Sequence, residues 1–161
     1  MVESSLPAAH WGEQFLTAPS WTALAELPER QRDQRILLTM ARLAEKPPGQ
    51  RGAALRQLLL AELELHDAAL EQLTLGRCRV WAALDDAGVR EFTNEALAVE
   101  YRFIPGPDAT RVRRAYAQAA EELSVDDAAR FERAAPAFLV RDGAKREAKR
   151  VGALRRLMGR S

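Results

Sequence analysis

The feature that most constrains the fold is a stripe of leucines in the middle of the chain. Apolar residues, with one histidine among them, recur at steps of three and four residues: Leu55, Leu59, Leu63, His66, Leu70 and Leu73. This spacing places them on one face of an α-helix, which Leu58 and Leu65 widen. A face this broad must be buried against at least two neighbours. We therefore expect one long helix at the centre of a helical domain.

The composition favours the same class of fold. Hydrophobic residues make up 47% of the 161 residues and charged residues 29%, which is ordinary for a globular domain. Aromatic residues make up only 6%, so the core must consist mainly of leucine, alanine and valine. The sequence predicts a mainly α protein, a single-domain helical bundle of about five or six helices.

Prolines and polar caps mark several helix boundaries. Pro28 suits the first turn of a helix, and the run Lys46-Pro47-Pro48-Gly49 must end that helix. Asp108 is a good N-cap after Pro105-Gly106-Pro107, and Ser124 is a good N-cap for the next helix. The chain thus divides into a loosely ordered leader at 1–20, a helical core at 21–140 and a basic C-terminal helix at 141–161.

Residues 78–104 allow two interpretations. In the first, the long helix continues to about Ala87. In the second, a small β-hairpin turns at residues 85–88 and a third strand follows. The second interpretation depends on four alternating apolar residues: Leu97, Val99, Tyr101 and Phe103.

Glu64, His66 and Asp67 are the candidate catalytic residues. Two carboxylates one helical turn apart can share a hard cation, as Glu64 and Asp67 would. The His66-Asp67 pair resembles the metal-binding step of HD-type phosphohydrolases, which also need another histidine upstream. Only His10, in the leader, is available. The favoured interpretation is a hydrogen-bonded histidine at the edge of the core beside a solvated acidic edge.

The sequence lacks the patterns expected of a zinc site, a phosphate loop, a disulfide, a signal peptide and a membrane span. Two histidines and the single cysteine, Cys78, cannot complete a typical zinc site, and there is no glycine-rich phosphate loop, so we expect no metal and no cofactor. Cys78 has no partner for an intramolecular disulfide. The N-terminus has no signal-peptide pattern, and no apolar run approaches the roughly 20 residues of a membrane span. We expect a cytoplasmic protein without membrane contact.

Residues 119–125 resemble the first helix and turn of a helix-turn-helix. Arg130 then falls where an apolar core residue is expected, and the acidic pair Asp126-Asp127 would repel phosphate. A capping box at Ser124 explains the same residues more simply.

The C-terminal segment 141–161 is strongly basic. It has eight basic and two acidic residues, a net charge of +6, while the preceding 140 residues have 16 basic and 21 acidic residues, a net charge of −5. Such a segment can bind nucleic acid or a protein, or dock on the acidic body of its own chain. The candidate nucleic-acid-binding residues are Lys145, Arg146, Lys149, Arg150, Arg155 and Arg156.

The functional expectation is a non-enzymatic accessory or regulatory protein. It would bind nucleic acid or a nucleoprotein partner through the basic C-terminal helix. One alternative is a metal-dependent nucleotide phosphohydrolase centred on Glu64, His66 and Asp67. Another is a self-assembling helical subunit, a homo-oligomer that uses the leucine-rich helix as its interface.

Overall fold

The computed structural model describes residues 18–139, 156, 158 and 159. Residues 18–139 form seven α-helices and two short 3-10 helices and contain no β-strand, which confirms the mainly α prediction. In chain order they are α2 (Ala18–Thr22), η1 (Ala23–Glu26), α3 (Glu29–Ala44), α4 (Pro48–Ala61), η2 (Glu62–Glu64), α5 (Asp67–Ala82), α6 (Asp86–Phe103), α7 (Gly106–Glu122) and α8 (Val125–Ala134). None of the helices in this part of the chain is long and apolar enough to cross a membrane.

The hairpin interpretation of residues 78–104 is wrong, because these residues form the end of α5 and the whole of α6. The helix does not continue to Ala87 either. Asp85 begins α6 by accepting a hydrogen bond from the Gly88 N–H at 2.7 Å. Burial in α6 follows a helical spacing, and the alternating Tyr101 and Phe103 are exposed. The buried residues of α6 are Val89, Phe92, Thr93, Ala96 and Val99.

The single long helix predicted from the leucine stripe is two helices. α4 continues into η2, the backbone becomes extended at Leu65, and α5 starts after His66. His66 is the N-cap of α5, since its Nδ1 accepts a hydrogen bond from the Ala69 N–H at 3.3 Å. Leu63 is only half-buried because it lies at this break. The stripe residues in the core are Leu55, Leu58, Leu59, Leu70 and Leu73.

The other boundary predictions have mixed outcomes. α3 ends at Ala44, before the proline run, as expected. Ser124 caps α8, with its Oγ accepting from the Asp127 N–H at 3.1 Å. The prediction for Asp108 is wrong, because α7 already begins at Gly106 and Asp108 lies in its first turn.

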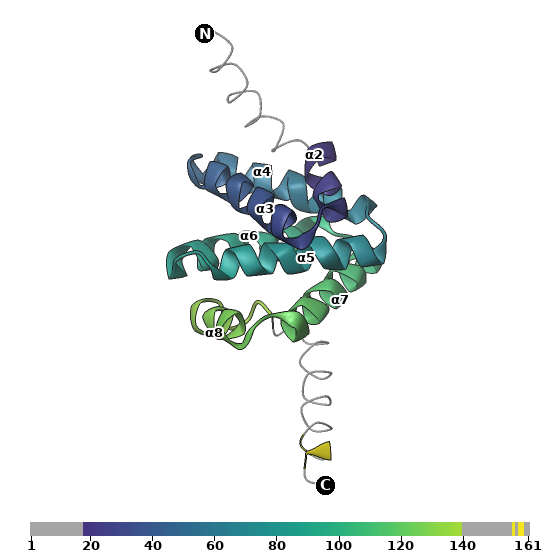
Figure 1. The fold of residues 1–161 in the computed structure, drawn as a ribbon. Coiled ribbons are helices and arrows are strands. Elements are labelled where there is room, and N and C mark those ends of the chain that lie inside the picture. Colours follow the sequence, from purple (N-terminus) through teal and green to yellow (C-terminus); the bar gives the residue numbers. More distant parts are fainter. Residues whose placement is uncertain (1–17, 140–155, 157, 160–161) are drawn as a thin grey trace.

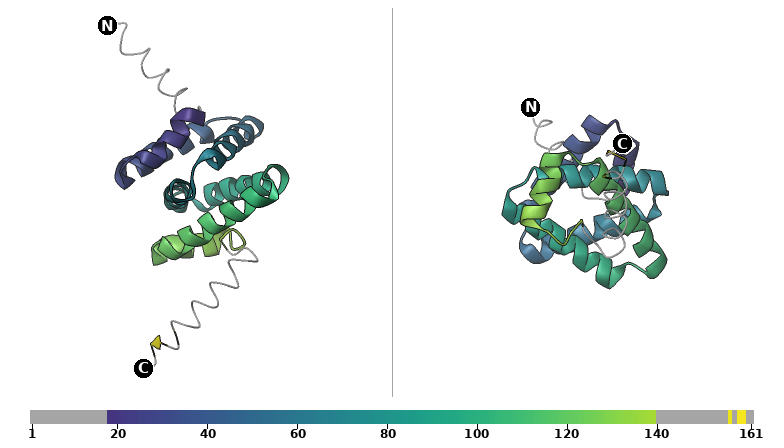
Figure 2. Two further views of the ribbon diagram at one scale, coloured as in Figure 1. Left: turned by 90° about the vertical axis from the view of Figure 1, so that its right-hand side faces the viewer. Right: turned by 90° about the horizontal axis from the view of Figure 1, so that it is seen from below.

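The helices are stacked in three tiers, with α2, α3 and α4 uppermost, α5 and α6 in the middle, and α7 and α8 below (Figure 1). One layer runs through the tiers from α3 to α5 to α7, and the other runs from α2 to α4 to α6 to α8. Figure 2 shows the same stack from the side and from below. This is the arrangement of stacked helical hairpins, in which each pair buries its apolar faces against the next pair.

α4 and α6 run in the same direction, as do α5 and α7. In one layer, Arg51 in the first turn of α4 pairs with Glu91 near the start of α6, and Arg56, further along α4, lies over the ring of Phe103 at the end of α6. In the other, Asp67 and Arg77 of α5 contact Arg111 and Tyr116 of α7. This parallel direction arises because consecutive helices lie in alternate layers, so that the chain returns to the same layer with every second helix.

An aromatic cluster fills the core between the middle and lower tiers. The Trp81 ring lies 5.9 Å from Phe92 and 5.9 Å from Phe138, centroid to centroid. Phe138, beyond the end of α8, also packs edge-on against Tyr116 at 4.9 Å. Large buried rings of this kind contribute much of the burial in a core with few aromatics. Phe138 thus anchors the chain after α8 to the rest of the domain.

Three arginines bind the carbonyl ends of helical segments. A helix leaves its last four carbonyls without intrahelical partners, and a guanidinium group can bind two or three of them. Arg51 donates to the carbonyls of Leu43, Ala44 and Lys46 at the end of α3; Arg111 donates to those of Leu63 and Leu65 after η2; Arg130 donates to those of Ala82 and Leu84 after α5. This explains the polar residue at position 130 that did not fit a helix-turn-helix core.

Candidate functional site

The predicted catalytic residues lie together at the break between η2 and α5. Glu64 ends η2, His66 caps α5, Asp67 is the first residue of α5, and all three are exposed. His66 does not lie at the core edge as expected, and its hydrogen bond goes to the backbone of its own helix. The three residues are close because they are neighbours in the chain, and the predicted core-edge environment of His66 is wrong.

Asp67 is engaged by arginines of α7. Its Oδ1 accepts from Arg111 Nε at 2.8 Å, and Arg114 lies 4.0 Å from its Oδ2. The hydrogen bond from Arg111 lowers the pKa of Asp67 below its usual value. Among the described residues no group of three or more histidine, cysteine, aspartate or glutamate side chains could hold a metal ion.

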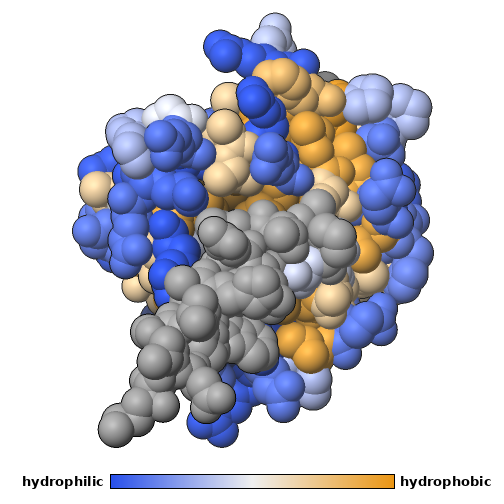
Figure 3. All heavy atoms as spheres, turned by 90° about the horizontal axis from the view of Figure 1, so that it is seen from above, coloured by the Kyte–Doolittle hydropathy of each residue, from blue (hydrophilic) through white to orange (hydrophobic). Residues whose placement is uncertain are grey.

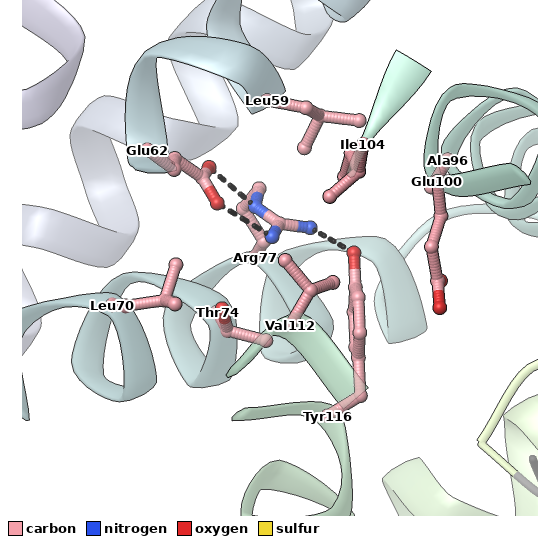
Figure 4. A pocket seen from close by; sticks show the side chains of 10 residues that line it. All are labelled: Leu59, Glu62, Leu70, Thr74, Arg77, Ala96, Glu100, Ile104, Val112 and Tyr116. Carbon is pink, nitrogen blue, oxygen red and sulfur yellow. Dashed lines mark hydrogen bonds and ion pairs between the residues drawn. The ribbon is translucent and has the colours of Figure 1, made fainter. Parts of the chain in front are cut away.

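A buried ion pair is the polar centre of the domain. Glu62 and Arg77 are each only 2% exposed. Arg77 Nε and Nη2 donate to the two Glu62 oxygens at 2.8 Å each, and Arg77 Nη1 donates to the Tyr116 hydroxyl at 2.8 Å. Trp21 Nε1 also donates to Glu62 at 2.8 Å. Figure 4 shows the guanidinium group between the carboxylate and the hydroxyl.

The environment of this pair determines its protonation states. Burial opposes the charge of Arg77, but Glu62 beside it raises the pKa of the guanidinium above its ordinary value. Burial raises the pKa of Tyr116 to about 12, against the opposing influence of Arg77. Arg77 is thus charged and Tyr116 is neutral across the ordinary pH range.

The network joins tiers and offers no room for a substrate. The adjoining cavity, lined by residues of α4–α7 and η2, has a volume of about 10 Å³, enough for about one water molecule. The network links Trp21 of α2 with Glu62 of η2, Arg77 of α5 and Tyr116 of α7. We conclude that it holds the three tiers in register.

A signal for this network is present in the sequence, although it was not among the predicted site residues. Arg77 lies seven residues after Leu70 and four after Leu73, so it continues the leucine stripe with a charged side chain. A charged residue in register with a buried face requires a partner. Its partner Glu62 lies three residues after Leu59, so it also falls on the buried face.

The upper tiers have an apolar groove. It has a volume of about 420 Å³ and lies between the second half of α3 and the first half of α6, with the Arg51–Glu91 ion pair in its lining. Leu37 and Leu38 of α3 are 47% and 49% exposed. Seen from above, hydrophobic side chains reach the surface between hydrophilic ones (Figure 3).

The leucine stripe itself is used within the domain. Leu55, Leu58 and Leu73 are completely buried, and Leu59 and Leu70 nearly so. The self-assembly alternative used the leucine-rich helix as an interface between copies of the chain. These five side chains are not available for such an interface.

Two aromatic side chains in the last turn of α6 are exposed. Tyr101 is 90% exposed and Phe103 is 47% exposed. The Arg56 guanidinium lies 4.6 Å from the centre of the Phe103 ring, and Arg113 Nε lies 3.4 Å from Glu100 Oε1.

The predicted nucleic-acid-binding residues lie at the C-terminus. Arg156 is helical and exposed. The other five, Lys145, Arg146, Lys149, Arg150 and Arg155, lie outside the described residues.

No protein family, curated protein or solved structure matches this chain significantly. The fold and its sites define the chain as a stacked helical-hairpin protein with a buried ion pair joining its tiers.

Proposed function

We propose that this protein is a non-enzymatic accessory protein that binds nucleic acid through its basic C-terminal segment, residues 141–161. The observation that carries the proposal is the separation of charge along the chain. Residues 18–139 hold 16 basic and 19 acidic residues, a net charge of −3, whereas residues 141–161 have a net charge of +6. A polyanion would be attracted to the segment and repelled by much of the body.

The engagement of the body's own arginines supports the same proposal. Arg77 is buried with Glu62, and Arg79 pairs with Asp33 at 2.7 Å. Arg51, Arg111 and Arg130 bind helix carbonyls. These cations already have partners within the fold. In the segment, eight basic residues accompany only Asp142 and Glu147, so local pairing cannot neutralise them.

The segment is better suited to phosphates than to a lipid surface. Its apolar stripe consists of Ala144, Ala148, Val151, Leu154 and Met158 and has no tryptophan or phenylalanine. Helices that lie on membranes usually have large aromatic or leucine-rich apolar faces. A narrow stripe with basic flanks is more suitable for following a phosphate backbone.

The test compares the full chain with a charge-neutralised variant. The variant carries Lys145→Gln, Arg146→Gln, Lys149→Gln and Arg150→Gln, and its matched control carries Arg146→Lys and Arg150→Lys. Fluorescence anisotropy is measured on labelled oligonucleotides over a salt series. If about four cations contact phosphates, log K should fall with log salt with a slope of about −3.6. The Gln variant should lose this dependence, and the Lys control should retain it.

Two outcomes would contradict the proposal. One is equal binding by the Gln variant and the unmodified chain, which would place the binding site in the body. The other is the absence of binding by the unmodified chain at low salt.

A further inference from the structure

We propose that α3 is the contact surface for a second copy of this chain, which packs its own α3 antiparallel against it about a two-fold axis. The surface is the face of α3 that points away from the core. It has exposed leucines at its centre and opposite charges at its two ends. It does not involve the C-terminal segment, so this inference and the proposed function can fail separately.

The exposed residues of this face lie on one side of the helix. At 3.6 residues per turn, the steps of three and four residues that separate them keep them within an arc of about 100°. Glu45, the C-cap of α3, still has helical backbone angles, so it continues the face. Ile36 contacts Gly76 of α5 from the opposite side of the helix. The residues of the outer face are Arg30, Gln34, Leu37, Leu38, Ala41 and Glu45.

This outer face is the open end of one layer of the stack. In that layer α5 lies between α3 and α7, and no described helix of the layer lies beyond α3 (Figure 1). The end faces of stacked helical proteins are usually polar, because nothing covers them. Leu37 and Leu38, at the centre of this one, are 47% and 49% exposed. The outer face of α3 is therefore suited to contact with a further helix.

The charges at the two ends of the face make it self-complementary. When the two-fold axis passes between Leu37 and Leu38, each of these leucines lies opposite the other leucine of the second copy. The same register places Arg30 of each copy opposite Glu45 of the other. Arg30 and Glu45 are separated by about 22 Å along the helix. A shallow helix crossing of about 20° would keep both pairs within reach of these long side chains.

Both charges are available for this contact. The acidic residues nearest to Arg30 in the sequence, Glu29 and Asp33, pair with Arg79 of α5. Within residues 18–139 neither Arg30 nor Glu45 forms an ion pair.

The apolar groove between α3 and α6 extends the contact. Leu37 and Ala41 of the outer face line it, so leucine side chains of the second copy can pack into it. The contact of one helix with another is smaller than a standard interface of about 1,600 Å². We therefore expect a dimer that dissociates at micromolar concentrations.

The first test exchanges the charges and measures dimerisation of the full chain by sedimentation velocity at micromolar concentrations. Arg30→Glu and Glu45→Arg each place like charges opposite one another at both ends, so each should weaken dimerisation about tenfold or more. Both substitutions in one chain should restore dimerisation, and an equimolar mixture of the two single variants should form a heterodimer. Arg102→Glu is the control, because it makes the same change in net charge at an exposed position of α6 and should leave the dimer unchanged.

The second test removes the apolar centre of the face. Leu37→Ser/Leu38→Ser should abolish dimerisation in the same concentration range. Val125→Ser is the matched control, because it changes an apolar side chain of α8 that is 85% exposed, and it should dimerise normally. A melting midpoint close to that of the control would show that the serine variant is folded. If its midpoint is much lower, the charge exchange decides, since Arg30 and Glu45 are both exposed.

Three outcomes would overturn the inference. The first is an unmodified chain that stays monomeric throughout the concentration range. The second is undiminished dimerisation by the serine variant. The third is a charge-exchanged double variant that dimerises as weakly as the two single variants, which would show that Arg30 and Glu45 do not meet across a two-fold axis.

Discussion

Arg77 and Glu62 are charged side chains buried among mostly apolar ones. Removing one partner of a buried pair leaves the other charge without compensation. We therefore expect Arg77→Met to lower the free energy of unfolding by about 3–5 kcal/mol. Urea denaturation followed by circular dichroism would measure the change.

The double variant Glu62→Gln/Arg77→Met is the control for this prediction. Because it removes both charges, it should be less destabilised than the sum of the two single variants. Additive effects of the single substitutions would show that the two side chains do not act as a pair.

Tyr116 should make stability depend on pH in the alkaline range. Burial raises its pKa to about 12, whereas in the unfolded chain it titrates near 10. The unfolded state therefore loses this proton first, so the contribution is fully present below pH 10 and declines as pH rises toward 12. The expected loss is about 2–3 kcal/mol across this window. Urea titrations at several alkaline pH values would measure it, and Tyr116→Phe should reduce the pH dependence.

Gly76 determines how closely α3 and α5 can approach. A Cβ at this position would lie 2.8 Å from Ile36 Cδ1 and 3.0 Å from Asp33 Oδ1. Ile36 is completely buried and has little space to move. We expect Gly76→Ala to destabilise the protein by about 1–3 kcal/mol, even though alanine favours helix.

Gly49→Ala is the matched control for Gly76→Ala, since nothing lies within 4 Å of the Cβ it would add in α4. It should be neutral or stabilise by up to about 1 kcal/mol. Thermal melts of the two variants would distinguish steric conflict from helix propensity. Equal shifts in melting temperature would contradict the assigned role of Gly76.

The elements were predictable where local chemistry determines them. Pro47 and Pro48 cannot continue α3, and the Ser124 hydroxyl begins α8 by accepting a hydrogen bond from a backbone N–H close by in the sequence. The break at Leu65 has a weaker local signal, the N-cap His66, since residues 62–67 contain neither proline nor glycine and the leucine spacing continues across them. Arg111 also stabilises the break, because its guanidinium binds the Leu63 and Leu65 carbonyls from a helix more than 40 residues away.

The candidate site shows the same division between local and distant determinants. Glu64, His66 and Asp67 could be grouped because they are neighbours in the sequence. The Glu62–Arg77 pair also depends on Trp21 and Tyr116, which approach from other tiers. Sequence spacing indicates that Arg77 needs a partner, but the identity of the partners follows only from the stacking of the helices.

At the scale of the whole molecule, α5 should be the most stable element. It lies in the middle tier and contacts α3, α6, α7 and α8. Opening its hydrogen bonds therefore requires separating several tiers at once. We expect its backbone amides to exchange with solvent most slowly and those of the ten-residue α8 to exchange much faster. Hydrogen-exchange mass spectrometry would measure the order, and slower exchange in α8 than in α5 would contradict it.

The arginine contacts at the ends of the helices have a practical consequence for handling the protein. Besides the carboxylates that Arg51, Arg111 and Arg130 also contact, their acceptors are backbone carbonyls, which do not titrate and which carry no net charge for salt to screen. Concentrated salt should therefore leave the carbonyl contacts between helices largely in place. Phosphate contacts, in contrast, weaken steeply as salt increases. A bound polyanion could thus be washed from an immobilised sample under conditions in which the helices remain stacked, and the recovered protein could be used again without refolding.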